Sequence, residues 1–253
     1  MIKEKSKKIH KAKVARIEKV SANSYLIEIE GEISQEIKAG QFISIYCENL
    51  TFRRPFSVFS HNSGKIGILF KERGKGTKYI KSLKKDDLID ITGVFGNGFN
   101  VENKKSLLIG AGIGAAPISF LKSKLNEKNI ENLFIAGFLN KNEIPSCIKA
   151  DIAYTDDGSY GRKGSVITDI ENIIKDYKPE IIYVCGPEIV LKTLSRIGEK
   201  YNIETQIAVE KVMACSIGVC RGCVISVRKD GNIVNAAVCK DGPVFSGSEV
   251  VWQ

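Results

Sequence analysis

The sequence predicts a multidomain β plus α/β protein: an antiparallel β-barrel, a doubly wound parallel sheet and a small C-terminal module. Three observations carry this prediction. Short strand-like runs fill residues 1–102, strands and helices alternate over residues 103–208, and four of the seven cysteines fall within residues 209–253. We therefore expect three domains with these boundaries.

The barrel is predicted by runs of β-branched and alternating apolar residues with glycines between them. The runs are Val14–Ile17, Ser24–Ile29, Gln41–Tyr46, Lys65–Phe70 and Asp87–Thr92, with turns marked by Gly31, Gly40, Gly64 and Gly93. Several short strands joined by such turns are typical of a small antiparallel barrel.

The second domain is predicted by strands that alternate with helices, a pattern typical of a parallel sheet covered on both faces. Expected strands are Leu107–Gly110, Leu133–Phe138, Ile152–Thr155 and Ile181–Cys185; expected helices are a run ending at Leu125, Val166–Tyr177 and Glu188–Lys200.

The chain has 253 residues and a formal net charge of +9. Its lysines are spread along the chain and are not interleaved with aromatic residues, so we expect a solvated basic surface rather than a nucleic-acid interface. No apolar signal core follows the lysine-rich start, Met1 to Lys13, and runs such as Ser106–Ala116 are shorter than the roughly 20 residues of a membrane span. We expect a cytoplasmic protein that binds neither nucleic acid nor membrane.

The most specific motif is Cys215-x4-Cys220-x2-Cys223-x15-Cys239. This is the plant-type [2Fe–2S] spacing, in which one tight loop supplies three thiolates and a fourth comes from elsewhere. Gly218 and Gly222 allow the backbone to fold close and aim N–H groups at the sulfurs. Structural zinc is the main alternative, but zinc modules usually carry two short-spaced cysteine pairs. The scattered Cys47, Cys147 and Cys185 have no partners at ligand spacing.

Two runs in the first domain favour a flavin nucleotide. Arg53-Arg54-Pro55-Phe56-Ser57-Val58 offers guanidinium groups suited to a pyrophosphate and a serine suited to the polar edge of a flavin ring. Gly74-Lys75-Gly76-Thr77 precedes a helix-like stretch, Lys78–Leu83, whose free N–H groups favour an anion. Each run alone is ordinary, but both together before a nucleotide-binding fold are more specific.

A glycine-rich turn in the second domain favours a dinucleotide. Leu107–Pro117 predicts a strand, a turn and a helix start, and Gly110, Gly112 and Ala115 fit G-x-G-x-x-A. The usual acidic ribose anchor is missing after the next strand, where Asn140 and Lys141 follow.

Two further strand ends are candidates for nucleotide contacts. The loop that begins Thr155-Asp156-Asp157 offers polar groups, and Cys185-Gly186-Pro187 offers a thiol. The Cys185 thiol either lies beside a nicotinamide or is a buried group in a strand-ending turn.

The order of these motifs resembles the ferredoxin reductase superfamily over the first 200 or so residues. Over essentially the full chain it is similar to the electron-transfer subunits of class 1B dihydroorotate dehydrogenase. The resemblance is carried by Arg54-Pro55-Phe56-Ser57, Gly76-Thr77, Gly93–Phe99, Gly110–Pro117, Cys185-Gly186-Pro187, Glu210–Cys223 and Cys239–Phe245. Ser216 departs from it, since the family loop commonly has glycine there; a serine either tightens the loop or adds a hydroxyl hydrogen bond to sulfur.

The resemblance implies an oxidoreductase subunit of pyrimidine (UMP) biosynthesis that holds FAD and a [2Fe–2S] cluster and uses NAD(H). It implies FAD contacts from Arg54, Pro55, Phe56, Ser57, Leu69, Phe70, Lys71, Gly76 and Thr77. It implies nicotinamide nucleotide contacts from Gly110, Gly112, Gly114, Ala115, Pro117, Cys185, Gly186 and Pro187, and cluster ligands Cys215, Cys220, Cys223 and Cys239. Asp156 is a further candidate for a nucleotide contact because of its place after a strand end. The implied partner is an FMN-containing dihydroorotate dehydrogenase chain, in a heterotetramer with two copies of each.

The flavin is expected between the other two groups, because a nicotinamide exchanges two electrons as hydride while an iron–sulfur cluster carries one at a time. Two alternatives share the motifs. One is the small flavin subunit of an NADH-dependent ferredoxin:NADP or sulfide oxidoreductase. The other is an electron-carrying adaptor that binds flavin and cluster but no nicotinamide.

Overall fold

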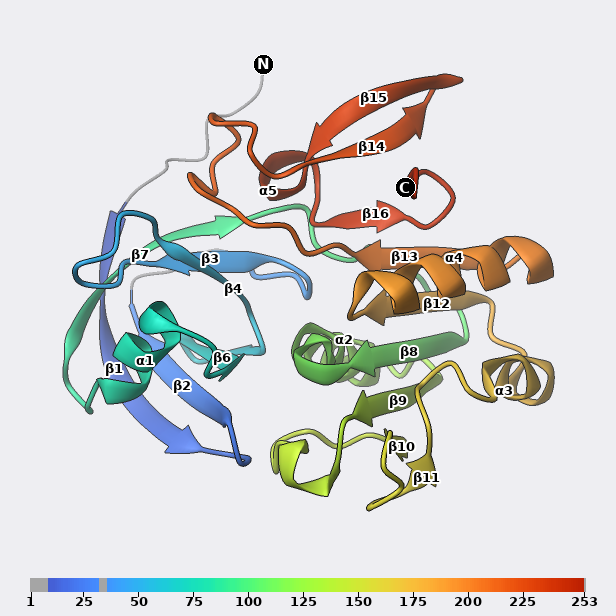
Figure 1. The fold of residues 1–253 in the computed structure, drawn as a ribbon, viewed down its shortest axis with the longest axis horizontal. Helices are drawn as coiled ribbons and strands as arrows, with labels where there is room; N and C mark the ends of the chain where they lie inside the picture. Colours follow the sequence, from blue (N-terminus) through green and yellow to red (C-terminus); the bar gives the residue numbers. More distant parts are fainter. Residues whose placement is uncertain (1–8, 32–35, 253) are drawn as a thin grey trace.

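The computed structural model of this chain describes residues 9–31 and 36–252 (Figure 1). Most of the lysine-rich start therefore lies outside the described residues. The described chain forms two seven-stranded sheets and a two-stranded hairpin. The antiparallel sheet, the α/β sheet and the small C-terminal module confirm the predicted fold class. Within the described residues, the longest apolar helical stretch falls short of what a membrane crossing requires.

The first sheet has the strand order β4-β3-β7-β1-β2-β6-β5, and every neighbouring pair is antiparallel. The sheet curls so that the edge strand β4 approaches β6, the strand next to the other edge: Phe56 on β4 and Phe70 on β6 lie with ring centroids 5.9 Å apart. Its elements are β1 (Ile9–Lys19), β2 (Ser24–Glu30), β3 (Phe42–Ile45), β4 (Arg54–Ser57), β5 (Ser60–Asn62), β6 (Lys65–Lys71), α1 (Lys75–Ser82) and β7 (Leu88–Phe95).

The second sheet has the order β11-β10-β9-β8-β12-β13-β16 and is parallel except at its last strand. Leu108 on β8 belongs to the core shared with α2 and the barrel, while Leu107 and Ile109 pack with residues of α3 and α4 on the other face. Both faces are therefore covered, as the predicted doubly wound sheet requires. The elements are β8 (Ser106–Ala111), η1 (Gly112–Gly114), α2 (Ala115–Glu127), β9 (Asn132–Phe138), η2 (Lys141–Glu143), β10 (Ile152–Thr155), β11 (Arg162–Lys163), α3 (Ile170–Tyr177), β12 (Ile181–Cys185), α4 (Glu188–Tyr201) and β13 (Glu204–Ala208).

The expected helix over Val166–Tyr177 begins too early, because α3 starts only at Ile170. The backbone N–H of Ser165 donates to Thr168 Oγ1 at 2.9 Å, which holds these residues in a turn. Val166 packs in the space left by Gly137 on β9, where an added Cβ would lie 2.5 Å from Val166 Cγ1. Tertiary packing of one valine therefore overrides the apolar pattern that predicted an earlier start.

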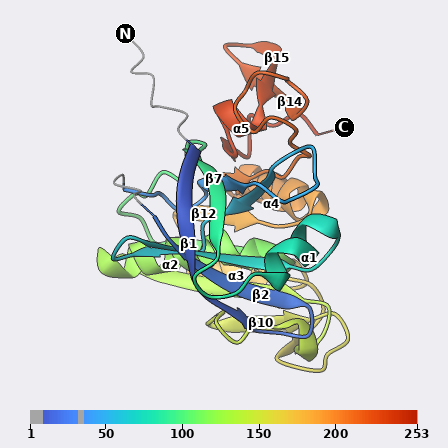
Figure 2. The same ribbon diagram turned by 90° about the vertical axis from the view of Figure 1, so that its left-hand side faces the viewer.

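The C-terminal segment contains the hairpin β14 (Val224–Lys229) and β15 (Asn232–Ala237), the short helix α5 (Val238–Asp241) and β16 (Val244–Ser246). Figure 2 shows α5, β14 and β15 together at one end of the molecule. β16 pairs antiparallel with β13, so this segment is anchored on the α/β sheet. Asn97 anchors it to the end of the barrel, since its side chain donates to the Val244 carbonyl (2.7 Å) and accepts from the Val244 N–H (3.1 Å).

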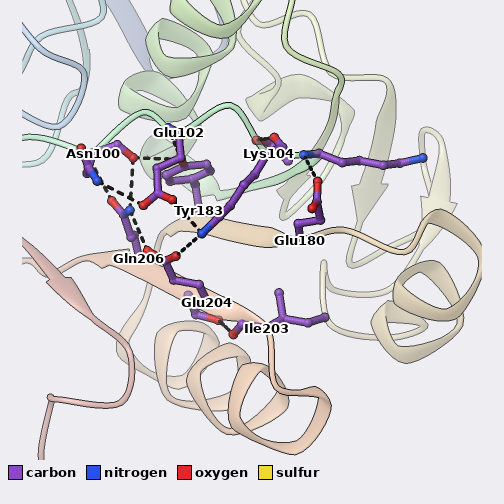
Figure 3. A network of polar contacts seen from close by, with 11 residues as sticks. Asn100, Glu102, Lys104, Glu180, Tyr183, Ile203, Glu204 and Gln206 are labelled. Atoms are coloured by element: carbon purple, nitrogen blue, oxygen red, sulfur yellow. Dashed lines mark hydrogen bonds and ion pairs between the residues drawn. The ribbon is translucent and has the colours of Figure 1, made fainter.

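The connection between the two large sheets is held by a polar network (Figure 3). The buried Tyr183 hydroxyl donates to the Asn100 carbonyl (2.9 Å), and Gln206 Nε2 donates to the same oxygen (3.1 Å). Gln206 Oε1 accepts from the Asn100 N–H (2.9 Å). Lys104 forms ion pairs with Glu102 (2.7 Å) and Glu204 (2.8 Å). The network fixes the linker to β12 and β13, and thereby the barrel to the α/β sheet.

Candidate functional site

A cavity of about 280 Å³ lies where the barrel, the α/β sheet and the C-terminal segment meet. The barrel contributes residues from β3, β4, β6 and the start of α1; the α/β sheet contributes its glycine turn; the C-terminal segment contributes two stretches of chain. The lining residues are Phe42, Pro55, Phe56, Ser57, Leu69, Phe70, Lys71, Arg73, Thr77, Ile113, Ala116, Pro117, Val209, Glu210, Lys211, Met213 and Pro243.

The residues expected to hold the flavin mostly line this cavity. Pro55, Phe56 and Ser57 come from β4, Leu69, Phe70 and Lys71 from the end of β6, and Thr77 from α1. The tilted Phe56 and Phe70 rings lie at the closure of the barrel. Lys71 is held by Glu143 of η2 at 2.8 Å, a half-buried ion pair that joins the barrel to the α/β sheet.

Arg54 and Gly76 do not line the cavity but pack against each other beside it. A Cβ added at Gly76 would lie 2.9 Å from Arg54 Cγ, so the arginine stem occupies the space that any other residue would fill. Arg54 Nη1 donates to the Phe52 carbonyl at 2.6 Å. Thr77 Oγ1 accepts from the N–H groups of Arg73 (2.9 Å) and Gly74 (3.1 Å), which fixes the start of α1 next to this arginine.

The glycine-rich turn follows β8 and leads through η1 into α2, as the sequence predicts. Close packing explains two of its glycines: a Cβ at Gly110 would lie 2.5 Å from Ala115 Cα, and one at Gly114 would lie 2.4 Å from the Cys185 carbonyl oxygen. Gly112 has φ +57° and no atom within 4 Å of an added Cβ. Glycine is therefore favoured there by the left-handed backbone conformation and not by close packing. Pro117 lines the cavity with Ile113 and Ala116, whereas Gly110, Gly112, Gly114 and Ala115 do not.

The Cys185-Gly186-Pro187 turn lies beside this glycine turn, since β12 and β8 are neighbours and their carboxyl ends coincide. Cys185 is 3% exposed, and burial raises the pKa of its thiol well above the usual range, with Glu210 adding to the shift. Burial therefore favours the neutral thiol over the thiolate. Asp156 lies apart from the cavity, just after β10, where its N–H donates to the Phe138 carbonyl at 3.0 Å.

The four clustered cysteines lie in the loop before β14 and in α5, and none is in a disulfide. Backbone N–H groups point at their sulfurs: Gly218 donates to Cys239 Sγ (3.1 Å), Cys220 to Cys215 Sγ (3.4 Å) and Gly222 to Cys220 Sγ (3.4 Å). Cys223 and Cys239 are buried, whereas Cys220 is exposed. The loop therefore presents thiols in a nest of donors, the surroundings that stabilise thiolate and sulfide.

The environments of Cys215 and Cys239 differ. Burial opposes ionisation of Cys215, but hydrogen bonds from the Cys220 and Ile217 N–H groups and from the Cys220 side chain outweigh it and lower its pKa to about 6. Burial and the neighbouring Cys223 raise the pKa of Cys239 to about 12. The Cys215 side chain thus favours the thiolate, and the Cys239 side chain favours the thiol.

Backbone hydrogen bonds link the four cysteines in two pairs, because the Cys220 N–H donates to Cys215 Sγ (3.4 Å) and the Cys239 N–H donates to Cys223 Sγ (3.5 Å). Among the residues that the structure describes, no three His, Cys, Asp or Glu side chains converge as ligands of a single metal ion. Two pairs fit a [2Fe–2S] cluster, in which four thiolates are shared between two irons, better than one tetrahedral zinc. The hydroxyl of Ser216, the residue after Cys215, is buried and has no hydrogen-bond partner among the described residues. This also fits a site that binds a group with a hydrogen-bond acceptor.

The cavity contains residues that the sequence motifs did not assign to it, among them Phe42, Arg73, Lys211, Met213 and Pro243. Glu210 is the one carboxylate among the residues that line it; it is exposed at the mouth, yet surrounding protein raises its pKa by desolvation, with Arg73 opposing. The only sequence feature that could have indicated three of these residues is their position, because Glu210, Lys211 and Met213 directly precede the cysteine loop. Met213 is two residues from Cys215, and Pro243 is four from Cys239, so two short stretches of chain link the cavity to the cysteines.

Comparison with known proteins agrees with this geometry. Residues 210–251 match the family described as the iron–sulfur cluster binding domain of dihydroorotate dehydrogenase B. The chain is 36% identical to the dihydroorotate dehydrogenase B (NAD(+)) electron transfer subunit of Caldanaerobacter subterraneus subsp. tengcongensis, covering 96% of this chain and 98% of the relative. It is 36% identical to the corresponding subunit of Clostridium acetobutylicum, covering 92% and 93%.

Solved structures share the fold of this chain. A structure of the NADH-dependent reduced ferredoxin-NADP oxidoreductase superimposes with a TM-score of 0.80 at 26% identity, over 95% of this chain and 89% of that one. Phthalate dioxygenase reductase shares the fold, with a TM-score of 0.66 at 15% identity over 92% and 77%. Because full-length relatives exceed 30% identity, the chain belongs to the family of dihydroorotate dehydrogenase B (NAD(+)) electron transfer subunits.

Proposed function

We propose that this chain is an NAD-linked oxidoreductase subunit that carries electrons from a dihydroorotate dehydrogenase catalytic chain to NAD⁺ in pyrimidine biosynthesis. The observation that carries the proposal is the cavity shared by barrel, glycine turn and C-terminal segment, with the cysteine loop directly attached to it. Membership of the electron transfer subunit family supports the same function.

Each part of the chain has a role in this proposal. The barrel domain (residues 1–102) holds FAD through Pro55, Phe56, Ser57, Leu69, Phe70, Lys71 and Thr77, with Arg54 and Gly76 at its phosphates. The α/β domain (103–208) holds NAD(H) through Gly110, Gly112, Gly114, Ala115 and Pro117, the Cys185-Gly186-Pro187 turn and Asp156. The C-terminal module (209–253) holds the [2Fe–2S] cluster through Cys215, Cys220, Cys223 and Cys239.

The arrangement suits a change from single electrons to electron pairs. FAD supplies the chemistry, because a flavin exchanges hydride with a nicotinamide and single electrons with an iron–sulfur centre. Met213 and Pro243 line the cavity and lie two and four residues from Cys215 and Cys239, so only short stretches of chain join the flavin site to the cluster site. Cys185, buried and neutral, packs at the strand end and positions the turn rather than transferring a proton.

The partner is proposed to be an FMN-containing catalytic chain, with two copies of each chain in the complex and the whole in the cytoplasm. The cysteine loop offers an exposed surface for it: Val212 is 90% exposed, Val219 69%, and Cys220 is accessible between apolar and basic neighbours. An apolar rim around an electron-transfer centre suits a partner that must exclude water at the contact.

A second candidate is the flavin subunit of an NADH-dependent ferredoxin-NADP oxidoreductase, which is favoured by the TM-score of 0.80 to that enzyme. The two functions differ in the partner and its substrate and share the cofactors. The identities of 36% to electron transfer subunits favour dihydroorotate dehydrogenase.

The test is to express the chain with the catalytic chain from the same genome and to follow electron flow without oxygen. We expect dihydroorotate to reduce NAD⁺ in the complex, and NADH to bleach the flavin band of the isolated chain. Cys220→Ser should abolish dihydroorotate-driven NAD⁺ reduction while NADH still reduces FAD. Cys147→Ser, which changes a cysteine far along the chain from the cluster loop, is the matched control.

FAD and iron content are measured on each sample. A Cys220→Ser complex that keeps its FAD and still couples dihydroorotate to NAD⁺ at the parental rate would contradict the relay. Coupling to ferredoxin and NADP⁺ but not to dihydroorotate would identify the second candidate instead.

A further inference from the structure

Ser216 is an unusual residue in the cysteine loop. It directly follows Cys215, it is 1% exposed, and its hydroxyl has no hydrogen-bond partner among the residues that the structure describes. Its neighbours on the loop are more open, since Cys215 and Ile217 are half-buried and Val219 is exposed. The serine side chain therefore turns inward, toward the body of the module.

Two features make a serine unfavourable here without a bound group. A buried hydroxyl that loses water and finds no acceptor is destabilising. The residue also has φ +60°, a left-handed conformation that glycine adopts without cost and other residues do not. Gly218 meets the same requirement two residues later, at φ +82°, with no side chain. Glycine at position 216 would remove both costs.

The donors around Ser216 show which kind of acceptor belongs there. The N–H groups of Gly218, Cys220 and Gly222 all point at cysteine sulfurs. Within the described part of the loop, these backbone groups point at sulfur, and Ser216, which directly follows Cys215, adds a buried side-chain donor to the same loop. The acceptor that it lacks is then a sulfur atom that is absent from the bare polypeptide or repositioned when the cluster forms.

We propose that Ser216 is a positioning residue for the iron–sulfur centre: its hydroxyl donates a hydrogen bond to a sulfur of the bound cluster and makes the reduction potential more positive. The inference rests on the proposed function, because it requires the cluster. A donor to sulfur favours the reduced state, since reduction adds negative charge that the hydrogen bond stabilises. The exchange of glycine for serine would then tune the potential while leaving the four ligands unchanged.

The test compares two variants of the complete, FAD-containing chain. Ser216→Gly removes the hydroxyl and relieves the left-handed backbone; Ser216→Ala removes the hydroxyl but keeps the Cβ. The midpoint potential of the cluster is measured by redox titration followed by electron paramagnetic resonance. Resonance Raman spectra of the Fe–S stretches in H₂O and D₂O give a second readout that does not depend on turnover.

We expect both variants to shift the midpoint potential in the negative direction by a similar amount and to lose part of the D₂O sensitivity. Ser248→Ala, an exposed serine that is hydrogen-bonded to Ser246 in the same segment, should leave both readouts unchanged. Parental potentials in both Ser216 variants would overturn the proposal. A shift in Ser216→Gly alone would also overturn it, because relief of the left-handed backbone would then be the cause.

The two levels of the proposal can fail separately. A parental protein with no iron or sulfide, prepared anaerobically, would refute the cluster and the proposed function together. A parental protein with an intact cluster and two silent Ser216 variants would refute the role of the serine and leave the proposed function in place.

Discussion

The α-carbon of Gly114 faces the carbonyl oxygen of Cys185, and a Cβ at Gly114 would lie 2.4 Å from that oxygen. The contact joins the glycine turn after β8 to the turn after β12, the two neighbouring strands at whose ends a dinucleotide is expected to bind. Neither atom belongs to a flexible side chain, so any larger residue must displace backbone.

Gly114→Ala should therefore disturb the nucleotide site without touching the cysteines. We expect overpacking to destabilise the protein by about 1–3 kcal/mol and NADH to reduce the flavin more slowly, with FAD and iron content retained. Thermal unfolding and anaerobic stopped-flow absorbance measure the two effects. Gly74→Ala is the matched control, because a Cβ there has nothing within 4 Å and φ is extended. Equal behaviour of the two variants would contradict the packing argument.

Arg54→Ala tests the flavin phosphate assignment. Loss of charge-assisted hydrogen bonds, each about 1.5–3 kcal/mol, should weaken FAD retention at least tenfold while the cluster stays bound. The adjacent Arg53 is the control, because neighbouring side chains at a strand start point to opposite faces. Arg53 Nη1 donates to the Asp90 carbonyl at 3.1 Å and its guanidinium lies over the Tyr46 ring. Arg53→Ala should keep FAD; dialysis followed by flavin fluorescence measures both.

Local sequence patterns predicted the elements that hold most of the site. The cysteine spacing, the strand–turn–helix at Gly110–Pro117 and the Arg54–Ser57 run each lie within one continuous stretch of at most 25 residues, so sequence alone reveals them. The confirmed α/β alternation has the same origin, because each strand and helix carries its own periodicity.

Contacts between segments that are far apart in the sequence were harder to predict. β16 follows the cysteine loop in sequence but pairs with β13 of the α/β sheet. The hydrogen bonds between Asn97 and Val244 join residues that are 147 positions apart in the sequence. Glu210 and Met213 reach the cavity only because β13 ends beside it. Nothing in the periodicity of those residues encodes such contacts, which depend on how three units pack together.

The linker network in Figure 3 gives a graded stability prediction. Tyr183→Phe removes one donor to the Asn100 carbonyl, to which Gln206 still donates, and the long 3.4 Å contact in which its hydroxyl accepts from the Glu102 N–H. We therefore expect a loss of about 0.5–1.5 kcal/mol. Gln206→Ala removes that second donor and also leaves the Asn100 N–H without its acceptor. Its cost should be larger, about 1–3 kcal/mol. The midpoint of thermal unfolding at a fixed scan rate ranks the variants, and a reversed order would contradict the roles given to Tyr183 and Gln206.

The last prediction concerns the pH dependence that Glu210 confers. Desolvation raises its pKa in the folded protein above the ordinary value of 4.5, although Arg73 opposes the shift. A group with a raised folded pKa contributes stability that is fully present below its unfolded pKa and is lost as pH rises through the folded pKa. Glu210→Gln, which stays neutral, should therefore be more stable than the parent at pH 7–8. The difference should shrink as the pH falls through 4.5, because below that pH the parental carboxyl is protonated in both states. Because solvent reaches the side chain at the cavity mouth, the gain should be smaller than for a fully enclosed carboxylate.

Unfolding midpoints of both FAD-loaded proteins across this pH range measure the difference in stability, with Glu249→Gln as a control at an exposed carboxylate. A pH-independent difference would show that the substitution acts through packing and not through the charge of Glu210.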